Sequence, residues 1–169
     1  SIMQERPLNP EEQPQQVLQQ AIILGHRRII ELAQADTSRH GMGTTIAAIL
    51  FTPQCAILAH VGDTRIYQLR GHRFIFRTQD HSFVGELVRQ GTLTEEQARC
   101  SSQSNLITHA LGSADNSEAD FDLRPYRCGD RFMLCSDGIW GMRPEPQLIN
   151  IATSGKPIAD IVESLAEDT

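Results

Sequence analysis

The sequence predicts an α+β domain in which antiparallel sheets are packed between helices. Apolar residues first recur at three- and four-residue steps, then change to short runs rich in Thr, Ile, Val and Phe, and later return to helical spacing. The resulting order is helix, strands, helices, strands, helices, which lacks the regular alternation of parallel β-α-β units. At 169 residues the chain is long enough for a substantial core, and we expect one domain over 1–169.

The first half of the chain predicts one long helix and four strands. The residues 1–14 are polar and rich in Pro and Gln, and we expect them to be loosely ordered. The helix is expected over 15–35, where the apolar face includes Val17, Leu18, Ala21, Ile22, Ile29 and Leu32. The strands are expected over 44–51, 55–61, 65–69 and 74–76. Short turn signals such as Gly62-Asp63 separate them, so we interpret the four strands as an antiparallel meander.

The second half predicts shorter elements. A helix over 83–90 should end at Gly91, and Thr94 with Gln97 three residues later predicts a capping box that opens another helix. The polar stretch 100–118 is interpreted as an exposed flap. Alternation at 121–123 and an apolar run at 132–135 predict two more strands. Two closing helices are expected, one after Pro144 and one over 158–166.

The charge, the apolar runs and the cysteine content argue against nucleic-acid-binding, membrane-spanning and secreted classes of protein. The net charge is -6, and the sequence has no large cluster of Lys and Arg, which argues against a nucleic-acid surface. The longest apolar runs, 46–51 and 55–59, are far shorter than a membrane helix, and no secretory signal is visible at the start of the sequence. Four cysteines show no C-x-x-C spacing. We therefore expect a reduced, cytoplasmic protein without a membrane span.

Two aspartates are the best candidates for metal ligands. Asp137 follows an apolar run in the segment RFMLCSDGIWGM, and Asp80 follows a predicted strand in RTQDHS. Carboxylates without Cys or spaced His partners suit a hard divalent ion such as Mg²⁺ or Mn²⁺. Aspartate is also common at strand ends, turns and helix caps for purely structural reasons. From spacing alone, both readings remain open for each residue.

Other residues give weaker signals. His81 could act as a general acid or base or make a local hydrogen bond, and the remaining histidines lack the spacing of a zinc site. Asp63, in the segment VGDTR, is interpreted as a turn residue first and a ligand second. The segment GMGTT lacks the GK[ST] ending of a phosphate-binding P-loop.

Five segments in order resemble the metal-dependent Ser/Thr protein phosphatases of type 2C, the PPM family, in their compact bacterial form. The resemblance extends from about Val17 to the end of the sequence. The segments are GMGTTIAAIL, AHVGDTRIYQLR, TQDHSFVGELVRQGTLTEEQAR, NLITHALGS and GDRFMLCSDGIWGM.

This resemblance implies a four-layer α-β-β-α sandwich with two antiparallel sheets flanked by helices, incomplete at both ends. It implies hydrolysis of phosphoserine and phosphothreonine in proteins by water activated at two Mn²⁺ or Mg²⁺ ions, with a third, weaker ion in bacterial members. Asp137 matches a ligand of the metal pair and Asp80 a ligand of the third ion, so we expect their carboxylates in one cleft, within about 10 Å. The implied partners are phosphorylated proteins, a Ser/Thr kinase and its substrates in signalling, with a monomeric phosphatase.

Two family motifs are absent from the sequence. No D-G-M-G-G segment precedes Gly41, and Asp115-Asn116, the only Asp-Asn pair, comes before the SDG motif instead of after it. We therefore expect a segment of a longer phosphatase that is inactive alone, with the remaining catalytic acids unknown. The alternative is an inactive phosphatase-like module that binds and regulates a partner.

Overall fold

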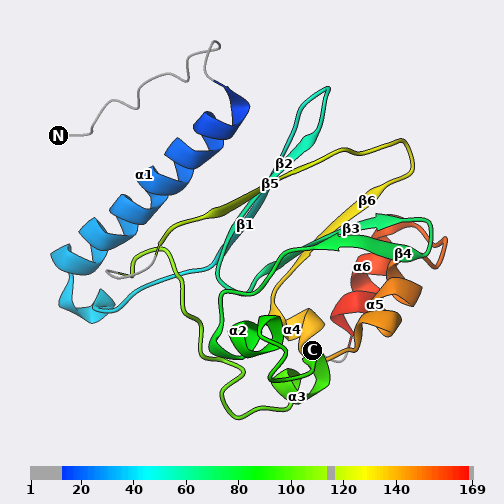
Figure 1. The fold of residues 1–169 in the computed structure, drawn as a ribbon. Coiled ribbons are helices and arrows are strands. Elements are labelled where there is room, and N and C mark those ends of the chain that lie inside the picture. The colour runs from blue at the N-terminus through cyan, green and yellow to red at the C-terminus, as the bar shows by residue number, and fades with distance from the viewer. Residues whose placement is uncertain (1–12, 114–116, 168–169) are drawn as a thin grey trace.

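Two antiparallel three-stranded sheets lie face to face between helices in the computed structural model of the chain, which describes residues 13–113 and 117–167 (Figure 1). The first sheet has the order β1-β2-β5, from strands Ile46–Phe51, Ala56–Val61 and Asp120–Arg124. The second has the order β4-β3-β6, from strands Arg73–Arg77, Arg65–Arg70 and Arg131–Cys135. The predicted α+β sandwich is confirmed.

The meander predicted for the first four strands is wrong as a single sheet. β1 pairs with β2, and β3 pairs with β4, but β2 and β3 belong to different sheets. The chain crosses between the sheets at Gly62, whose φ of 98° is a conformation that favours glycine. A Cβ there would lie 2.3 Å from Cγ2 of Thr45. The turn signal was therefore correct, but it marks a change of sheet.

Side-chain alternation along the central strands separates three apolar layers. On β2, Ala59 and Val61 pack against the long first helix, whereas Ala56 and Leu58 face the second sheet. On β3, Ile66 faces the first sheet, whereas Tyr67 and Leu69 face the C-terminal helices. Both strands are buried because a layer packs on each of their faces and a neighbouring strand pairs with each of their edges. The order of layers is therefore helix, sheet, sheet, helices.

The helices occupy the predicted positions, with two short additions, α4 and a 3₁₀ helix. Figure 1 shows α1 on the outer side of the first sheet and α5 with α6 beside the second. The bounds are Pro14–Ala35 for α1, Phe83–Arg89 for α2, Glu95–Arg99 for α3, Asp137–Trp140 for α4, Glu145–Ala152 for α5 and Ile158–Ala166 for α6, with a short 3₁₀ helix at Thr37–Arg39. The sequence predicted a tight turn where the single helical turn α4 lies. None of the described helices combines the length and apolar character that crossing a membrane requires.

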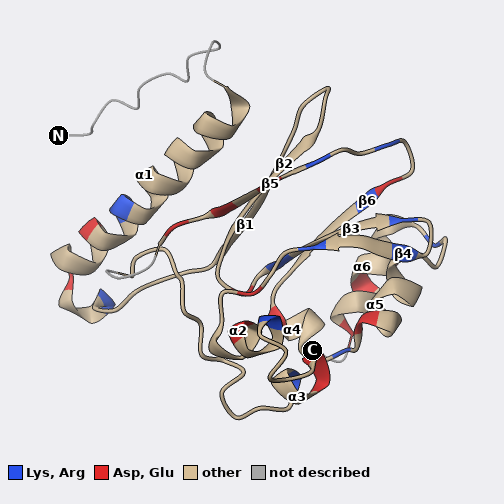
Figure 2. Ribbon diagram, in the orientation of Figure 1, with Lys and Arg blue, Asp and Glu red and all other residues tan. Residues whose placement is uncertain are grey.

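The predicted flap is irregular but attached to the domain by two isolated bridges and by a hydrogen bond from the N–H of Gly112 to Nδ1 of His26. Leu111 forms an isolated bridge with Thr44 and is buried, and Ile107 forms another with Ser82. Asp115-Asn116 and most of the segment expected to be loose, 1–14, lie outside the described residues. Charged residues are distributed over the described helices and over β3, β4, β5 and β6, whereas β1 and β2 carry none (Figure 2).

Candidate functional site

Asp80 lies in the loop between β4 and α2, at the end of the sandwich where α2, α3 and α4 gather (Figure 1). Ser82 caps α2 by accepting a hydrogen bond from the N–H of Gly85, which fixes the start of the helix two residues after Asp80. The Asp80 carboxylate accepts two hydrogen bonds from Arg65, from Nε to Oδ1 at 2.8 Å and from Nη2 to Oδ2 at 2.7 Å. The two side chains are only 9% and 7% exposed, so this is a bidentate ion pair largely shielded from water.

Arg65 contacts more than Asp80. Its guanidinium carbon lies 3.6 Å from the centre of the Trp140 ring, and its Nη1 donates to the Tyr67 hydroxyl at 3.1 Å. Trp140 in turn donates from Nε1 to the backbone carbonyl of Asp63 at 3.0 Å. The guanidinium therefore joins the Asp80 loop to α4, the helix that begins at Asp137.

Asp137 is exposed and lies at the first position of α4, separated from the end of β6 only by Ser136. Its Oδ1 accepts a hydrogen bond from the N–H of Gly138 at 3.0 Å, as expected for an aspartate that starts a helical turn. Among the described residues no Lys, Arg or His forms an ion pair with this carboxylate. Asp137 thus presents negative charge at the same end of the sandwich as Asp80 without a basic partner in the described part of the chain.

Asp63 is an acid that the sequence analysis ranked as a turn residue. Its pKa is raised, first by partial burial and then by the negative charge of Asp137, with a smaller effect from Asp80. Both predicted ligands are therefore close enough to Asp63 for their negative charges to raise its pKa. The sequence could not show this, because the approach of α4 to the β2–β3 turn depends on the crossing between sheets. The distance between the Asp80 and Asp137 carboxylates remains a prediction.

A second cluster contains His60, His81 and Asp120, whose potential ligand atoms all lie within 4.8 Å of one another. The Nδ1 of His81 accepts a hydrogen bond from the backbone N–H of Gly62 at 3.3 Å, so in the neutral ring the proton lies on Nε2. That Nε2 donates to Asp120 at 3.1 Å, which leaves no free nitrogen lone pair on His81. Burial is the main cause that lowers the pKa of His81 and keeps the ring neutral.

These bonds favour a structural role for His81 over both zinc binding and acid–base chemistry. Its backbone N–H also donates to the carbonyl of Gly62 at 3.0 Å, and its carbonyl accepts from the N–H of Thr108 at 2.8 Å. His81 therefore fastens the Asp80 loop to the crossing between sheets and to the flap. This is the local hydrogen-bonding role that the sequence analysis left open.

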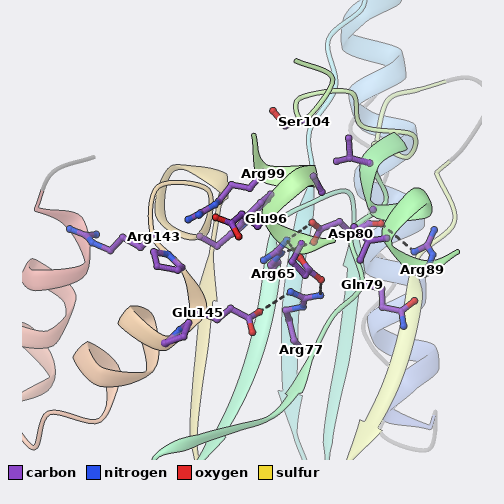
Figure 3. Close-up of a pocket in the computed structure, with 18 residues that line it drawn as sticks. Arg65, Arg77, Gln79, Asp80, Arg89, Glu96, Arg99, Ser104, Arg143 and Glu145 are labelled. Atoms are coloured by element: carbon purple, nitrogen blue, oxygen red, sulfur yellow. Dashed lines mark hydrogen bonds and ion pairs between the residues drawn. The ribbon is translucent and has the colours of Figure 1, made fainter. Parts of the chain in front are cut away.

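A cavity of about 650 Å³ lies beside Asp80 (Figure 3). Charged side chains from two strands of the second sheet, β3 and β4, and from three helices, α2, α3 and α5, line it, and many of them are paired with one another. Arg77 donates to Glu95 at 2.6 Å and to Glu145 at 2.7 Å, and Glu95 also lies 3.9 Å from Arg65. The lining includes Arg65, Arg77, Asp80, Arg89, Glu95, Glu96, Arg99, Trp140, Arg143 and Glu145.

The chain is similar to known bacterial phosphatases over most of its length. It is 39% identical over 140 residues to protein phosphatase PhpP of Streptococcus pneumoniae, a match that covers 83% of this chain and 56% of PhpP. It is 32% identical to the solved serine/threonine phosphatase PstP/Ppp of Mycobacterium tuberculosis, with a TM-score of 0.84 over 95% of this chain and 68% of that one.

A structure of the PstP catalytic domain in complex with two manganese ions matches at 32% identity, with a TM-score of 0.81 over 94% of this chain and 66% of that one. No protein-family model matches the chain. The chain spans a little over half the length of the curated relatives it matches.

Proposed function

The chain belongs to the type 2C (PPM) family of bacterial protein serine/threonine phosphatases, and from this we propose that it forms part of a domain that hydrolyses phosphoserine and phosphothreonine in other proteins. The observation that carries the proposal is the match in both sequence and structure along nearly the whole chain. We further propose that the protein acts in the cytoplasm as a monomer, on substrates of a Ser/Thr kinase. Four free cysteines support a reducing compartment.

The acids at the end of the sandwich fit a hard divalent cation. Asp137 has no ionic partner among the described residues, and the raised pKa of Asp63 reflects burial and the unfavourable proximity of Asp137 and Asp80. A divalent cation would relieve that repulsion, and carboxylate oxygens are the ligands that Mg²⁺ and Mn²⁺ prefer. We propose Asp137 as a ligand of a metal pair and Asp80 as a ligand of a third ion. The relative solved with two manganese ions supports Mn²⁺, and Mg²⁺ has the same ligand preference.

The bound ions would supply a water molecule activated for attack on phosphorus and positive charge for the phosphate oxygens. The described residues would contribute geometry and charge. Asp137 places its carboxylate at the start of α4, just after the C-terminal end of β6. Trp140 fixes α4 against the β2–β3 turn by donating a hydrogen bond to the Asp63 carbonyl. His81 holds the loop that carries Asp80. The remaining acids of the site are not identified among these residues.

A phosphatase assay tests the proposal. The 169-residue chain and the longer protein that contains it are each incubated with a phosphothreonine peptide and Mn²⁺, and release of phosphate is measured. We expect Mn²⁺-dependent release from the longer protein and none from the 169-residue chain, because Asp63, Asp80 and Asp137 alone supply too few oxygen ligands for a metal pair.

Substitution of the proposed ligands gives the residue-level test. Asp137→Asn in the active protein should lower kcat by at least about 100-fold, because it removes negative charge that holds the ions activating the water. Asp80→Asn should have a smaller effect, because the third ion is held more weakly. If the longer protein releases no phosphate with either Mn²⁺ or Mg²⁺, the alternative of an inactive binding module is favoured instead.

A further inference from the structure

The negative charge of Asp80 is already balanced by an arginine of the same chain. Both Asp80 oxygens accept hydrogen bonds from Arg65, and both side chains are more than nine-tenths buried. A cation that approaches Asp80 therefore meets a neutral pair and the positive charge of Arg65, which weakens its binding. Each carboxylate oxygen still has a second lone pair, so Asp80 can bind a cation if the hold of Arg65 relaxes.

Glu95 is the side chain positioned to compete with Asp80 for Arg65. Its Oε2 lies 3.9 Å from Nη2 of Arg65, the same nitrogen that donates to Asp80 at 2.7 Å. Its other oxygen, Oε1, is engaged by Nη2 of Arg77 at 2.6 Å. Partial burial raises the pKa of Glu95, but the hydrogen bond from Arg77 and the positive charges of Arg77 and Arg65 together outweigh this and lower the pKa, so Glu95 is charged at neutral pH. Glu95 is therefore shared between the two arginines.

The position of Glu95 is set by α3. Glu95 is the first residue of that helix, and the helix start is fixed by reciprocal hydrogen bonds between Thr94 and Gln97, at 2.8 and 3.2 Å. Arg65 itself is held on its other sides by the Trp140 ring and the Tyr67 hydroxyl. Only the edge of the guanidinium that faces Asp80 and Glu95 can exchange partners without disturbing the core.

We propose that Arg65 and Asp80 form a competing ion pair that limits cation binding at Asp80, and that Glu95 on α3 regulates this site by drawing Arg65 away from Asp80. The inference rests on the proposed role of Asp80 as a metal ligand. A movement of α3 toward Arg65 would strengthen cation binding at Asp80, and engagement of Glu95 by Arg77 would weaken it. Helix α3 thereby becomes a positioning element for a metal ligand that it does not itself contain.

Three variants of the phosphatase that contains this chain separate the possibilities, with Mn²⁺ binding measured by the EPR signal of free Mn²⁺. Asp80→Asn should abolish the weaker Mn²⁺ site that we propose at Asp80 (the weak site), and its loss identifies that site in the titration. Glu95→Gln should then weaken Mn²⁺ binding at that site by roughly two- to fivefold, the range expected for a half-exposed ion pair. Arg77→Gln should strengthen it by a similar factor, because Glu95 is released toward Arg65.

Controls distinguish exchange of partners from a general change in charge. Glu96→Gln removes the same charge from the next residue of α3, which is exposed and has no ion pair among the described residues, and it should leave the weak site unchanged. In a double-mutant cycle, Arg77→Gln should have no effect when Glu95→Gln is already present, because its action passes through Glu95. Unfolding temperatures of all variants should stay close to that of the parent.

The outcomes are separable from those of the phosphatase assay. Additive effects of Arg77→Gln and Glu95→Gln, or equal effects of Glu95→Gln and Glu96→Gln, would show a general electrostatic field and overturn the proposal. If Asp80→Asn leaves every Mn²⁺ site intact, Asp80 is not a ligand and the proposal is wrong even if the protein releases phosphate. The protein could instead release no phosphate while it binds Mn²⁺ and the double-mutant cycle gives the predicted result. That outcome would contradict the proposed phosphatase activity but support the competing ion pair.

Discussion

The candidate ligands of the site could be predicted from single residues that follow strands. Asp80 and Asp137 could be selected because each follows an apolar strand, a pattern that is visible in the sequence itself. The ion pair of Asp80 with Arg65 could not be predicted, because Arg65 lies on β3 and Asp80 in the loop after β4, and the pairing of these two strands was unknown. The same holds for Asp130, in the turn before β6, whose carboxylate accepts hydrogen bonds from side chains on β3.

Asp130 predicts a pH-dependent contribution to stability. Hydrogen bonding by Arg70 is the main cause that holds its pKa well below the usual range, against the opposing effect of burial. A carboxyl whose pKa is lower in the folded state stabilises the protein above the unfolded pKa of about 3.9, and this contribution is lost as the pH falls below that value. We expect Asp130→Asn to reduce the free energy of unfolding by about 1–3 kcal/mol at pH 7.

Urea unfolding of the parent and of Asp130→Asn at pH 7, 5, 4 and 3 measures this difference. It should be constant between pH 7 and 5 and shrink at pH 4 and 3. A difference that stays the same at pH 3 would show that the effect of the substitution comes from packing and not from the charge of Asp130.

At the scale of elements, the sequence predicted what has a strong local signal. The α3 capping box was read from Thr94 and Gln97 and is confirmed by reciprocal hydrogen bonds. The positions of α1, α2 and α6 were predicted to within a residue or two from apolar spacing. Helix α4 was missed because four residues containing Gly138 are too few to show a period. Its place is set by tertiary contacts of Trp140, which no local pattern encodes.

Trp140→Phe tests how α4 is held. Phenylalanine can still stack on Arg65, but it cannot donate to the Asp63 carbonyl, which receives the indole N–H at 3.0 Å. We expect a loss of about 1–2 kcal/mol in the free energy of unfolding, measured by denaturant titration with circular dichroism. The control is Tyr126→Phe, which removes a donor to the Thr52 carbonyl at an exposed position and should cost less than about 0.5 kcal/mol. Equal losses in both variants would mean that α4 does not depend on this bond.

For the whole molecule, apolar alternation predicted sheets covered by helices, but the division into two sheets came only from the family resemblance. Spacing alone suggested a single meander, because a turn that reverses the chain within a sheet and one that crosses between sheets use the same residues. The structure shows that the core depends on contacts between the sheets, where Leu58 on β2 packs with Ile66 on β3.

Leu58→Ala measures the strength of that contact. Leu58 is 1% exposed, so truncation leaves a cavity between the sheets and should lower the free energy of unfolding by about 2–5 kcal/mol. Leu123→Ala on β5 is the matched control, since Leu123 is 57% exposed and its truncation should cost less than about 1 kcal/mol. Denaturant unfolding at pH 7 compares the two. Similar costs would indicate that the sheets are not packed as described.

The outer position of β1 has a consequence for the behaviour of the purified chain. Four described strands, β1, β4, β5 and β6, lie at sheet edges, and β1 is the one among them without a charged residue. Its sequence, Ile46–Phe51, is six consecutive apolar residues without proline, which is the composition of segments that stack into amyloid fibrils. Charged side chains on the other three outer strands oppose the addition of a foreign strand, whereas β1 offers unpaired backbone groups next to Phe51, which is 53% exposed. Self-association through β1 is therefore the form of aggregation to which this chain is most susceptible.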